Sequence, residues 1–314
     1  MLKKLLIGSI ALSIGFAAQA EVPNVVTTIK PLHSLVAQIM DGVGEPKLLI
    51  KEGSPHAYAL KPSDVKAMND AQLLVWVSDD LETFMAGSAA KIKGAKTLIW
   101  DKSAGVKLLK TRSGGLWEEA HHHHGDEDSG FSHMDGGHDH HHGEYNFHLW
   151  LGTENAAPLL KAVAADLSIL DKDNADKYEQ NLQTALKNLQ TLHQEVAQSL
   201  EGVARKPYMT FHDAYPYFEE EFALNPVGVV RADLEHEPGA KRIGELRAVL
   251  QENKVACIFN EPQFSSKLTD KLIEGTQVKV GVLDPVGADL ATGPAMFGEL
   301  QKNLAKGLKD CFAQ

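Results

Sequence analysis

Histidine is the residue type whose number and spacing most clearly suggest chemistry in this sequence. Fifteen histidines occur among 314 residues, and nine of them fall between positions 121 and 142, mixed with five acids. Imidazole nitrogens are preferred ligands of zinc, copper and nickel, and carboxylates add oxygen ligands and negative charge. The segment therefore predicts binding of a divalent transition metal. Its residues are His121, His122, His123, His124, His133, His138, His140, His141 and His142, with Asp126, Glu127, Asp128, Asp135 and Asp139.

The composition of this segment argues against a tight site within it. Between Thr111 and Tyr145 the chain is rich in His, Gly, Asp and Glu and poor in apolar residues, which predicts a disordered loop over about residues 113–145. Each ion bound by such a loop must also order it. We expect several weak, interchangeable sites here, so a tight site has to lie on rigid elements.

Three of the other six histidines stand where ligands could be held. His212 and Asp284 each follow a predicted strand, and ligands of parallel sheets collect beyond the carboxyl ends of the strands. His56 lies in a turn just past another strand, and His148 lies in an apolar setting that would bury its ring. Each could equally be an ordinary hydrogen-bonded histidine. Their separations of 92 and 64 residues match no local zinc motif.

The remaining histidines are less suited to a metal site. His33 begins the first predicted helix and is a marginal candidate for the cleft. His193 lies on a long helix and His236 in an acidic turn, so both are expected at the surface.

Short β-branched runs alternate with helical patterns along most of the chain. This alternation predicts parallel sheets with helices on their faces, an α/β fold class. The second half repeats the architecture of the first without a clear sequence repeat. The predicted strands cover residues 25–29, 47–50, 73–77 and 97–100 in the first half, and 208–211, 227–230, 255–259 and 278–283 in the second.

A long helix is predicted between the two halves. Over residues 174–200 apolar side chains recur every three or four positions with no Gly or Pro between them. At 1.5 Å per residue this helix would be about 40 Å long, enough to connect two lobes.

The first twenty residues predict export. Lys3 and Lys4 precede an apolar run that ends in Ala18-Gln19-Ala20, the small-x-small pattern of a signal peptide cleaved after residue 20. The run is too short for a membrane span, so we expect a periplasmic chain without membrane insertion. Loss of two lysines takes the net charge from −11 to −13, which argues against a nucleic-acid partner.

The chain has two cysteines, Cys257 and Cys311. In an exported chain, oxidising conditions favour a disulfide between them, and two unpaired thiols are the alternative.

Five segments closely resemble the zinc-binding proteins of high-affinity zinc ABC importers, within the metal-specific cluster of solute-binding proteins. The resemblance covers essentially all of the mature chain, including the His-rich insertion, the long helix and the two cysteines. The segments are S-P-H-A-Y-A-L-K-P-S-D-V (54–65), N-F-H-L-W-L (146–151), F-H-D-A-Y-P-Y-F (211–218), N-E-P-Q-F (260–264) and L-D-P-V-G (283–287).

The resemblance implies two lobes, each with a four-stranded parallel sheet flanked by helices, joined by one long rigid helix with the metal between the lobes. The expected boundaries are residues 21–170 for the N-terminal lobe, 171–203 for the linking helix and 204–314 for the C-terminal lobe.

The family's ligand positions fall on His56, His148 and His212, a set that suits tetrahedral zinc. Asp284 matches an aspartate that is either the fourth ligand or separated from the metal by water. Some relatives carry a glutamate where this chain has Pro55, which leaves the fourth position to Asp284 or water. Glu261 and Asp213 could orient ligands, although surface or cap roles suit them equally, and Trp150 and Tyr215 could wall the cleft or fill the core.

The implied function is capture of Zn²⁺ and delivery to an inner-membrane ABC permease by a monomeric binding protein that is not an enzyme. A manganese or iron member of the same family is the nearest alternative, but its sites use more carboxylate. A zinc hydrolase would need a motif such as H-E-x-x-H, which the sequence lacks. A zinc store or surface adhesin remains a third possibility.

Overall fold

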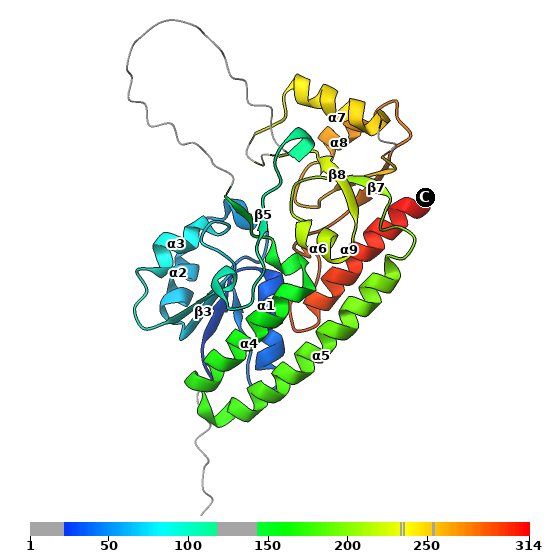
Figure 1. Ribbon diagram of the computed structural model, residues 1–314. Helices are drawn as coiled ribbons and strands as arrows, with labels where there is room; N and C mark the ends of the chain where they lie inside the picture. The colour runs from blue at the N-terminus through cyan, green and yellow to red at the C-terminus, as the bar shows by residue number, and fades with distance from the viewer. Residues whose placement is uncertain (1–21, 118–142, 233, 235, 253–254) are drawn as a thin grey trace, which may run out of the picture.

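The computed structural model describes residues 22–117, 143–232, 234, 236–252 and 255–314. The predicted signal peptide and the nine clustered histidines lie outside these residues. Two lobes are visible in Figure 1, each built around its own sheet.

The first lobe contains a four-stranded sheet in the order β2-β1-β3-β4, in which every pairing is parallel. All four residues of β3 are buried, as expected for a parallel strand with both faces covered. In Figure 1, α2 and α3 lie on the outer side of this sheet and α1 and α4 on the side nearer α5. The strands are β1 (Val25–Thr27), β2 (Lys47–Leu48), β3 (Leu73–Trp76) and β4 (Lys96–Ile99).

The second lobe repeats this arrangement in the order β10-β9-β7-β8, again entirely parallel. Side chains of β9 alternate between two apolar clusters, with Cys257 and Phe259 in one and Ile258 in the other. This period of two follows from the pleat of a strand whose two faces are both covered. The strands are β7 (Pro207–Thr210), β8 (Asn225–Val229), β9 (Cys257–Asn260) and β10 (Lys279–Val282).

Nine α-helices are found within the described residues. They are α1 (Lys30–Met40), α2 (Pro62–Asn69), α3 (Thr83–Ala89), α4 (Thr153–Leu170), α5 (Ala175–Ser199), α6 (Pro216–Glu221), α7 (Ala240–Glu252), α8 (Lys267–Ile273) and α9 (Met296–Ala313). None of the helices that could be examined combines the length and apolar character needed to cross a bilayer. The two parallel sheets and the long α5 confirm the predicted fold class.

The helix α5 connects the lobes. Its 25 residues run along one edge of the molecule in Figure 1, beside α1 and α4 of the first lobe and α9 of the second. The N-terminus of α9 is also fastened directly to α1, because the Ser34 hydroxyl donates to the Pro294 carbonyl at 3.1 Å and accepts from the Phe297 N–H at 2.9 Å. Direct contact between α1 and α9 therefore holds the two lobes together in addition to α5.

A single apolar core extends through both lobes. It contains Leu32 and Trp76 from the first lobe, Leu189 from α5, and Phe218 and Leu300 from the second. A smaller cluster, which includes Met209 and Leu246, fills the outer side of the second sheet. A core shared in this way resists separation of the lobes, because opening it would expose apolar surface to water.

Two short strands, β5 (Leu109–Lys110) and β6 (Tyr145–Asn146), pair as an antiparallel ribbon. In the sequence, β5 precedes the His-rich segment and β6 follows it. Residues 113–117 and 143–145, which fall within the expected loop of about residues 113–145, have defined positions, and the rest of that range lies outside the described residues. Leu116 packs against Gly228 in the second lobe, and the Arg112 guanidinium lies 3.7 Å from the centre of the Trp117 ring. These apolar and cation–π contacts hold the residues just before the His-rich segment, and composition alone did not reveal them.

Cys257 at the start of β9 and Cys311 near the end of α9 form a disulfide. The bond ties the second sheet to the helix that packs beside α5.

Candidate metal centre

Three histidines distant in sequence converge between the lobes. One ring nitrogen of each of His56, His148 and His212 lies within 4.8 Å of the other two. The Nε2 atom of His148 is 3.2 Å from that of His56 and 3.3 Å from that of His212. Tetrahedral zinc with Zn–N bonds of about 2.0–2.1 Å would hold adjacent ligand nitrogens about 3.3–3.4 Å apart. The two measured distances match this spacing.

His56 is placed by a short 3-10 helix that follows β2. The helix, Pro55–Ala57, begins after Ser54, whose hydroxyl accepts from the His56 backbone N–H at 3.3 Å. Pro55 is buried and fixes the backbone at the first position of this turn. His56 itself is exposed at the surface of the protein, so it marks the open side of the cluster.

His148 follows β6 and is 6% exposed. Its Nδ1 atom and its backbone N–H both contact the Asn146 Oδ1 atom at 3.0 Å. The backbone N–H can only donate, so this amide atom is an oxygen, and Nδ1 must donate to it as well. The Nε2 atom of His148 therefore carries no proton.

His212 lies two residues beyond β7 and is 7% exposed. Its Nδ1 atom is 2.7 Å from a carboxylate oxygen of Glu261, the residue that follows β9. A carboxylate accepts, so Nδ1 of His212 donates, and in the neutral ring this leaves the Nε2 lone pair free to bind a metal. Glu261 thus has the orienting role that the sequence suggested.

Burial lowers the pKa of the His148 ring well below its ordinary value, and the neighbouring His212 and His56 add to this lowering. Desolvation likewise lowers the pKa of His56, with repulsion from His212 as a second cause. Because much of His56 is exposed, crowding of its inward-facing nitrogen is the better explanation than full burial. Both rings are therefore neutral at pH 7, as metal ligands must be.

The cluster lines a cavity of about 20 Å³ together with Trp150 and Glu261. This volume suits one water-sized occupant. Glu261 is 2% exposed, and its carboxylate accepts a hydrogen bond from Nδ1 of His212. A cation among the three nitrogens would offset this buried negative charge.

Asp284 follows β10 as expected but does not join the cluster. Its Oδ1 atom accepts from the Gln263 side-chain amide at 2.8 Å and from the Val286 and Gly287 N–H groups at 3.1 and 3.0 Å. Its Oδ2 atom accepts from the Ala288 N–H at 2.6 Å. In this conformation the carboxylate holds its own turn, so ligation would require these hydrogen bonds to break.

Asp213 and Tyr215, which were also considered from the sequence, have structural roles. The Asp213 carboxylate pairs with Arg112 rather than with a ligand, and the Tyr215 hydroxyl donates to the Leu283 carbonyl at 3.3 Å. The Trp150 ring centre is 5.1 Å from that of His148, so this residue does wall the site.

The three remaining described histidines lie outside the cluster. The Nε2 atom of His33 is 2.9 Å from the Pro46 carbonyl oxygen, and His193 pairs with Glu221. The backbone carbonyl of His236 accepts from Arg231 at 2.7 Å.

Asn146 is a contact residue of this site that the sequence reasoning missed. Its position two residues before His148 was the available signal, because asparagine side chains often accept from the backbone N–H two residues later. Without the structure this contact could not be separated from an ordinary turn.

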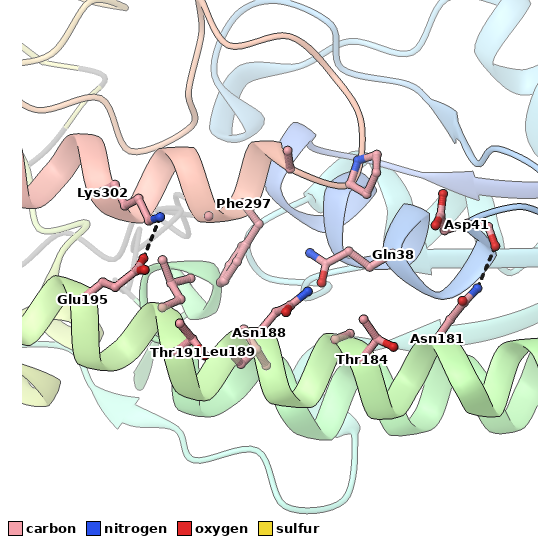
Figure 2. A pocket seen from close by; sticks show the side chains of 15 residues that line it. Gln38, Asp41, Asn181, Thr184, Asn188, Leu189, Thr191, Glu195, Phe297 and Lys302 are labelled. Carbon is pink, nitrogen blue, oxygen red and sulfur yellow. Dashed lines mark hydrogen bonds and ion pairs between the residues drawn. The ribbon is translucent and has the colours of Figure 1, made fainter.

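A larger cavity, of about 470 Å³, lies away from the histidines between α1, α5 and α9 (Figure 2). Amide and hydroxyl side chains such as Gln38, Asn188 and Thr184 line it, and the Lys302–Glu195 ion pair, 2.6 Å long, crosses one end. The lining includes no histidine or cysteine. Cavity volume alone would therefore not identify the candidate metal site.

Several known proteins with similar sequences carry the same name. A family profile described as "Zinc-uptake complex component A periplasmic" matches residues 25–311. The "High-affinity zinc uptake system protein ZnuA" of Brucella suis biovar 1 (strain 1330) is 38% identical over 318 residues, which cover 96% of this chain and 95% of the relative. The protein of the same name from Yersinia pestis is 34% identical over 293 residues, or 91% of this chain and 90% of that one.

Solved structures share the fold. A structure titled "Crystal structure of ZnuA" aligns with a TM-score of 0.72 and 21% identity over 92% of this chain and 100% of that one. A mutant of the laminin-binding adhesin Lmb of Streptococcus agalactiae aligns with a TM-score of 0.72 and 21% identity over 91% and 99% of the two chains. The sequence matches, over nearly the full length of chain and relatives alike, show that this chain belongs to the family of periplasmic A components of zinc-uptake complexes.

Proposed function

We propose that this protein captures Zn²⁺ between its lobes with His56, His148 and His212 and delivers it for uptake. The main support is the convergence of the three rings, with the Nε2 atoms of His148 and His212 only 3.3 Å apart. With both Nδ1 protons committed to Asn146 and Glu261, two neutral rings would face each other with Nε2 lone pairs that repel. A cation between them turns this repulsion into coordination.

The ligand set favours zinc over manganese or iron. Three imidazoles suit a tetrahedral, borderline-soft ion, whereas manganese sites take more oxygen ligands. The carboxylate of Asp284 is occupied by its own turn. Water, or Asp284 after release from that turn, supplies the fourth ligand. The relatives named for zinc uptake support the same choice.

Delivery is to an inner-membrane ABC permease, with the mature protein acting as a monomer in the periplasm after removal of residues 1–20. The protein carries out no reaction on its cargo. Binding exchanges the water around zinc for imidazole nitrogens, and release reverses the exchange.

The His-rich segment acts as an auxiliary collector of zinc. Deletion of residues 119–142 should lower the number of ions bound at saturation and leave the tightest site intact, because the three ligands of that site lie on other elements. Isothermal titration of the deleted and full-length proteins would measure both quantities. Loss of the tightest affinity on deletion would place the main site in the segment instead.

Competitive titration with a zinc chelator tests the main proposal. His148→Ala should weaken zinc binding by more than about 100-fold, since one of three protein ligands is lost and a cavity replaces it. His193→Gln is the matched control, because His193 lies on α5 and pairs with Glu221. Equal zinc affinity in wild type and His148→Ala would contradict the proposal.

Crystals grown with zinc give a second test. Anomalous scattering at the zinc edge should locate the ion within about 2.1 Å of the three Nε2 atoms. A manganese titration that matches the zinc affinity would favour the alternative cargo.

A further inference from the structure

We propose that Asn146 is a positioning residue of the metal site, whose one amide group sets the His148 ring and fixes its distance from His212 across the two lobes. This inference rests on the proposed zinc function and adds a residue to it. Asn146 is 7% exposed, and its amide bonds to His148 and to the Asp213 backbone.

The amide makes three hydrogen bonds, and its orientation is unambiguous. Its Oδ1 atom accepts from the His148 backbone N–H and Nδ1 atom, both at 3.0 Å. Its Nδ2 atom donates to the Asp213 backbone carbonyl at 2.6 Å. A flipped amide would place a donor against an N–H and an acceptor against a carbonyl, so only one orientation satisfies all three partners.

The first consequence is a fixed tautomer. Acceptance by Oδ1 keeps the proton of His148 on Nδ1, so that the lone pair of Nε2 faces the cluster. In the other tautomer a proton would occupy the direction from which a metal must bind. Asn146 therefore does for His148 what Glu261 does for His212, with a neutral group in place of a charged one.

The second consequence is a link between the lobes. Asn146 belongs to β6 and precedes one ligand by two residues, whereas Asp213 directly follows the ligand His212 of the second lobe. The bond from Nδ2 thus ties the chain beside one ligand to the chain beside the other. Both ends of the link are themselves held, since the Tyr217 hydroxyl donates to the Asn146 carbonyl and Arg112 pairs with the Asp213 carboxylate.

A purely structural role for a buried amide is the competing explanation, and the chain contains a matched example. Asn155 is 3% exposed, and its side chain exchanges hydrogen bonds with the Lys107 backbone at 2.9 and 3.0 Å. It binds the same kind of partners as Asn146 but contacts no histidine. Asn155→Ala therefore removes a similar set of buried hydrogen bonds without touching a ligand.

Zinc affinity of wild type, Asn146→Ala, Asn146→Asp, Asn155→Ala and His148→Ala should be compared by chelator competition. Loss of an orienting partner typically weakens metal binding about 10- to 100-fold, which is the loss expected for Asn146→Ala. Asn146→Asp keeps an acceptor for His148 and loses the donor to Asp213, so its affinity should fall between those of wild type and Asn146→Ala. Asn155→Ala should bind zinc as wild type does.

Cobalt(II) provides a spectroscopic readout that lower stability alone would not change. The visible bands of the cobalt-loaded protein should shift in Asn146→Ala, because one imidazole is free to turn, and should stay unchanged in Asn155→Ala.

Wild-type zinc affinity and cobalt spectrum in Asn146→Ala, together with weak binding in His148→Ala, would overturn the inference and leave the proposed function standing. Wild-type affinity in His148→Ala as well would overturn both. If Asn146→Ala does not fold, ¹⁵N shifts of the imidazoles in zinc-free wild type give the decision. A proton on Nδ1 of His148 is expected, and a proton on Nε2 would refute the inference.

Discussion

The two buried histidines of the proposed zinc site differ in the group that orients them. His212 donates to a carboxylate, Glu261, and His148 to an amide, Asn146. A carboxylate partner raises the basicity of an imidazole ligand more than a neutral amide does. His212 should therefore be the stronger donor to zinc, although both rings present the same nitrogen.

Glu261→Gln tests this difference. The amide can still accept from Nδ1 of His212, but the negative charge beside the ring is lost. We expect zinc affinity to fall about tenfold, at the lower end of the effect of removing an orienting partner. Chelator competition measures it, with the exposed Glu274→Gln as control. Unchanged affinity would mean that the negative charge of Glu261 does not contribute to zinc binding.

The lowered pKa of His148 makes the stability of the zinc-free protein depend on pH. Below pH 6.5 the unfolded chain protonates this histidine while the folded chain does not. The free energy of unfolding should therefore decrease as pH falls below 6.5, by at most about 1.4 kcal/mol per pH unit for this group. Thermal unfolding between pH 7.5 and 5 would show it, and His148→Ala should have a shallower dependence. An identical dependence in both proteins would contradict the cause.

The sequence predicted the identities of the three histidines but not their geometry. Strand ends pointed to His212, and resemblance added His56 and His148, whose separations carry no local signal. The conformation of the Asp284 carboxylate could not be foreseen, because a strand-end aspartate can either turn to a ligand or hold its own turn by accepting from N–H groups. Only coordinates distinguish these two uses of one carboxylate.

At the scale of elements, the second sheet brings its functional residues to one edge. His212 follows β7, Glu261 follows β9 and Asp284 follows β10, and these strands are parallel. Their carboxyl ends therefore lie at the same edge of the sheet, facing the first lobe. The periodicity of the sequence predicted these strands to within about two residues, since each is a compact apolar run.

The disulfide lies at the opposite end of this sheet from the ligands, which separates its effect on stability from any effect on zinc. Cys257 begins β9, whereas Glu261 follows its end. Replacing both Cys257 and Cys311 with serine should lower the free energy of unfolding by about 2–4 kcal/mol, because a 54-residue separation is no longer closed in the unfolded chain.

Urea unfolding would measure the loss, and reduced wild type should match the double variant. Zinc affinity of the folded double variant should equal that of wild type. A lower affinity would show that the bond also shapes the edge that carries His212.

Composition could not predict the ribbon at the base of the His-rich segment. β5 and β6 have two residues each, too few for a periodic signal, and pair across the segment between them. The strands contact the second lobe through the Leu109 N–H, which donates to the Tyr217 hydroxyl, and the Asn146 side chain, which donates to the Asp213 carbonyl. Such long-range contacts leave no pattern in the local sequence.

At the scale of the whole molecule, the shared core limits how far the lobes can move. Apolar side chains of both lobes and α5 form one cluster, and Trp150 donates to the Pro285 carbonyl across the boundary. Zinc-free and zinc-loaded forms should have radii of gyration within about 1 Å of each other, as in preorganised complexes. Small-angle X-ray scattering of both forms would measure this. A decrease of several ångströms on loading would indicate wide closure instead.

The absence of charge on the three proposed ligands has an electrical consequence. Each bound ion adds two positive charges to the molecule, and no carboxylate among these ligands cancels them. His56 carries part of that change to the surface. A molecule that contacts the protein there would experience a different electrostatic potential when the ion is bound. The effect extends over the Debye length, roughly 8 Å at physiological ionic strength. A filled molecule can thus be told from an empty one by its field, without any change of shape.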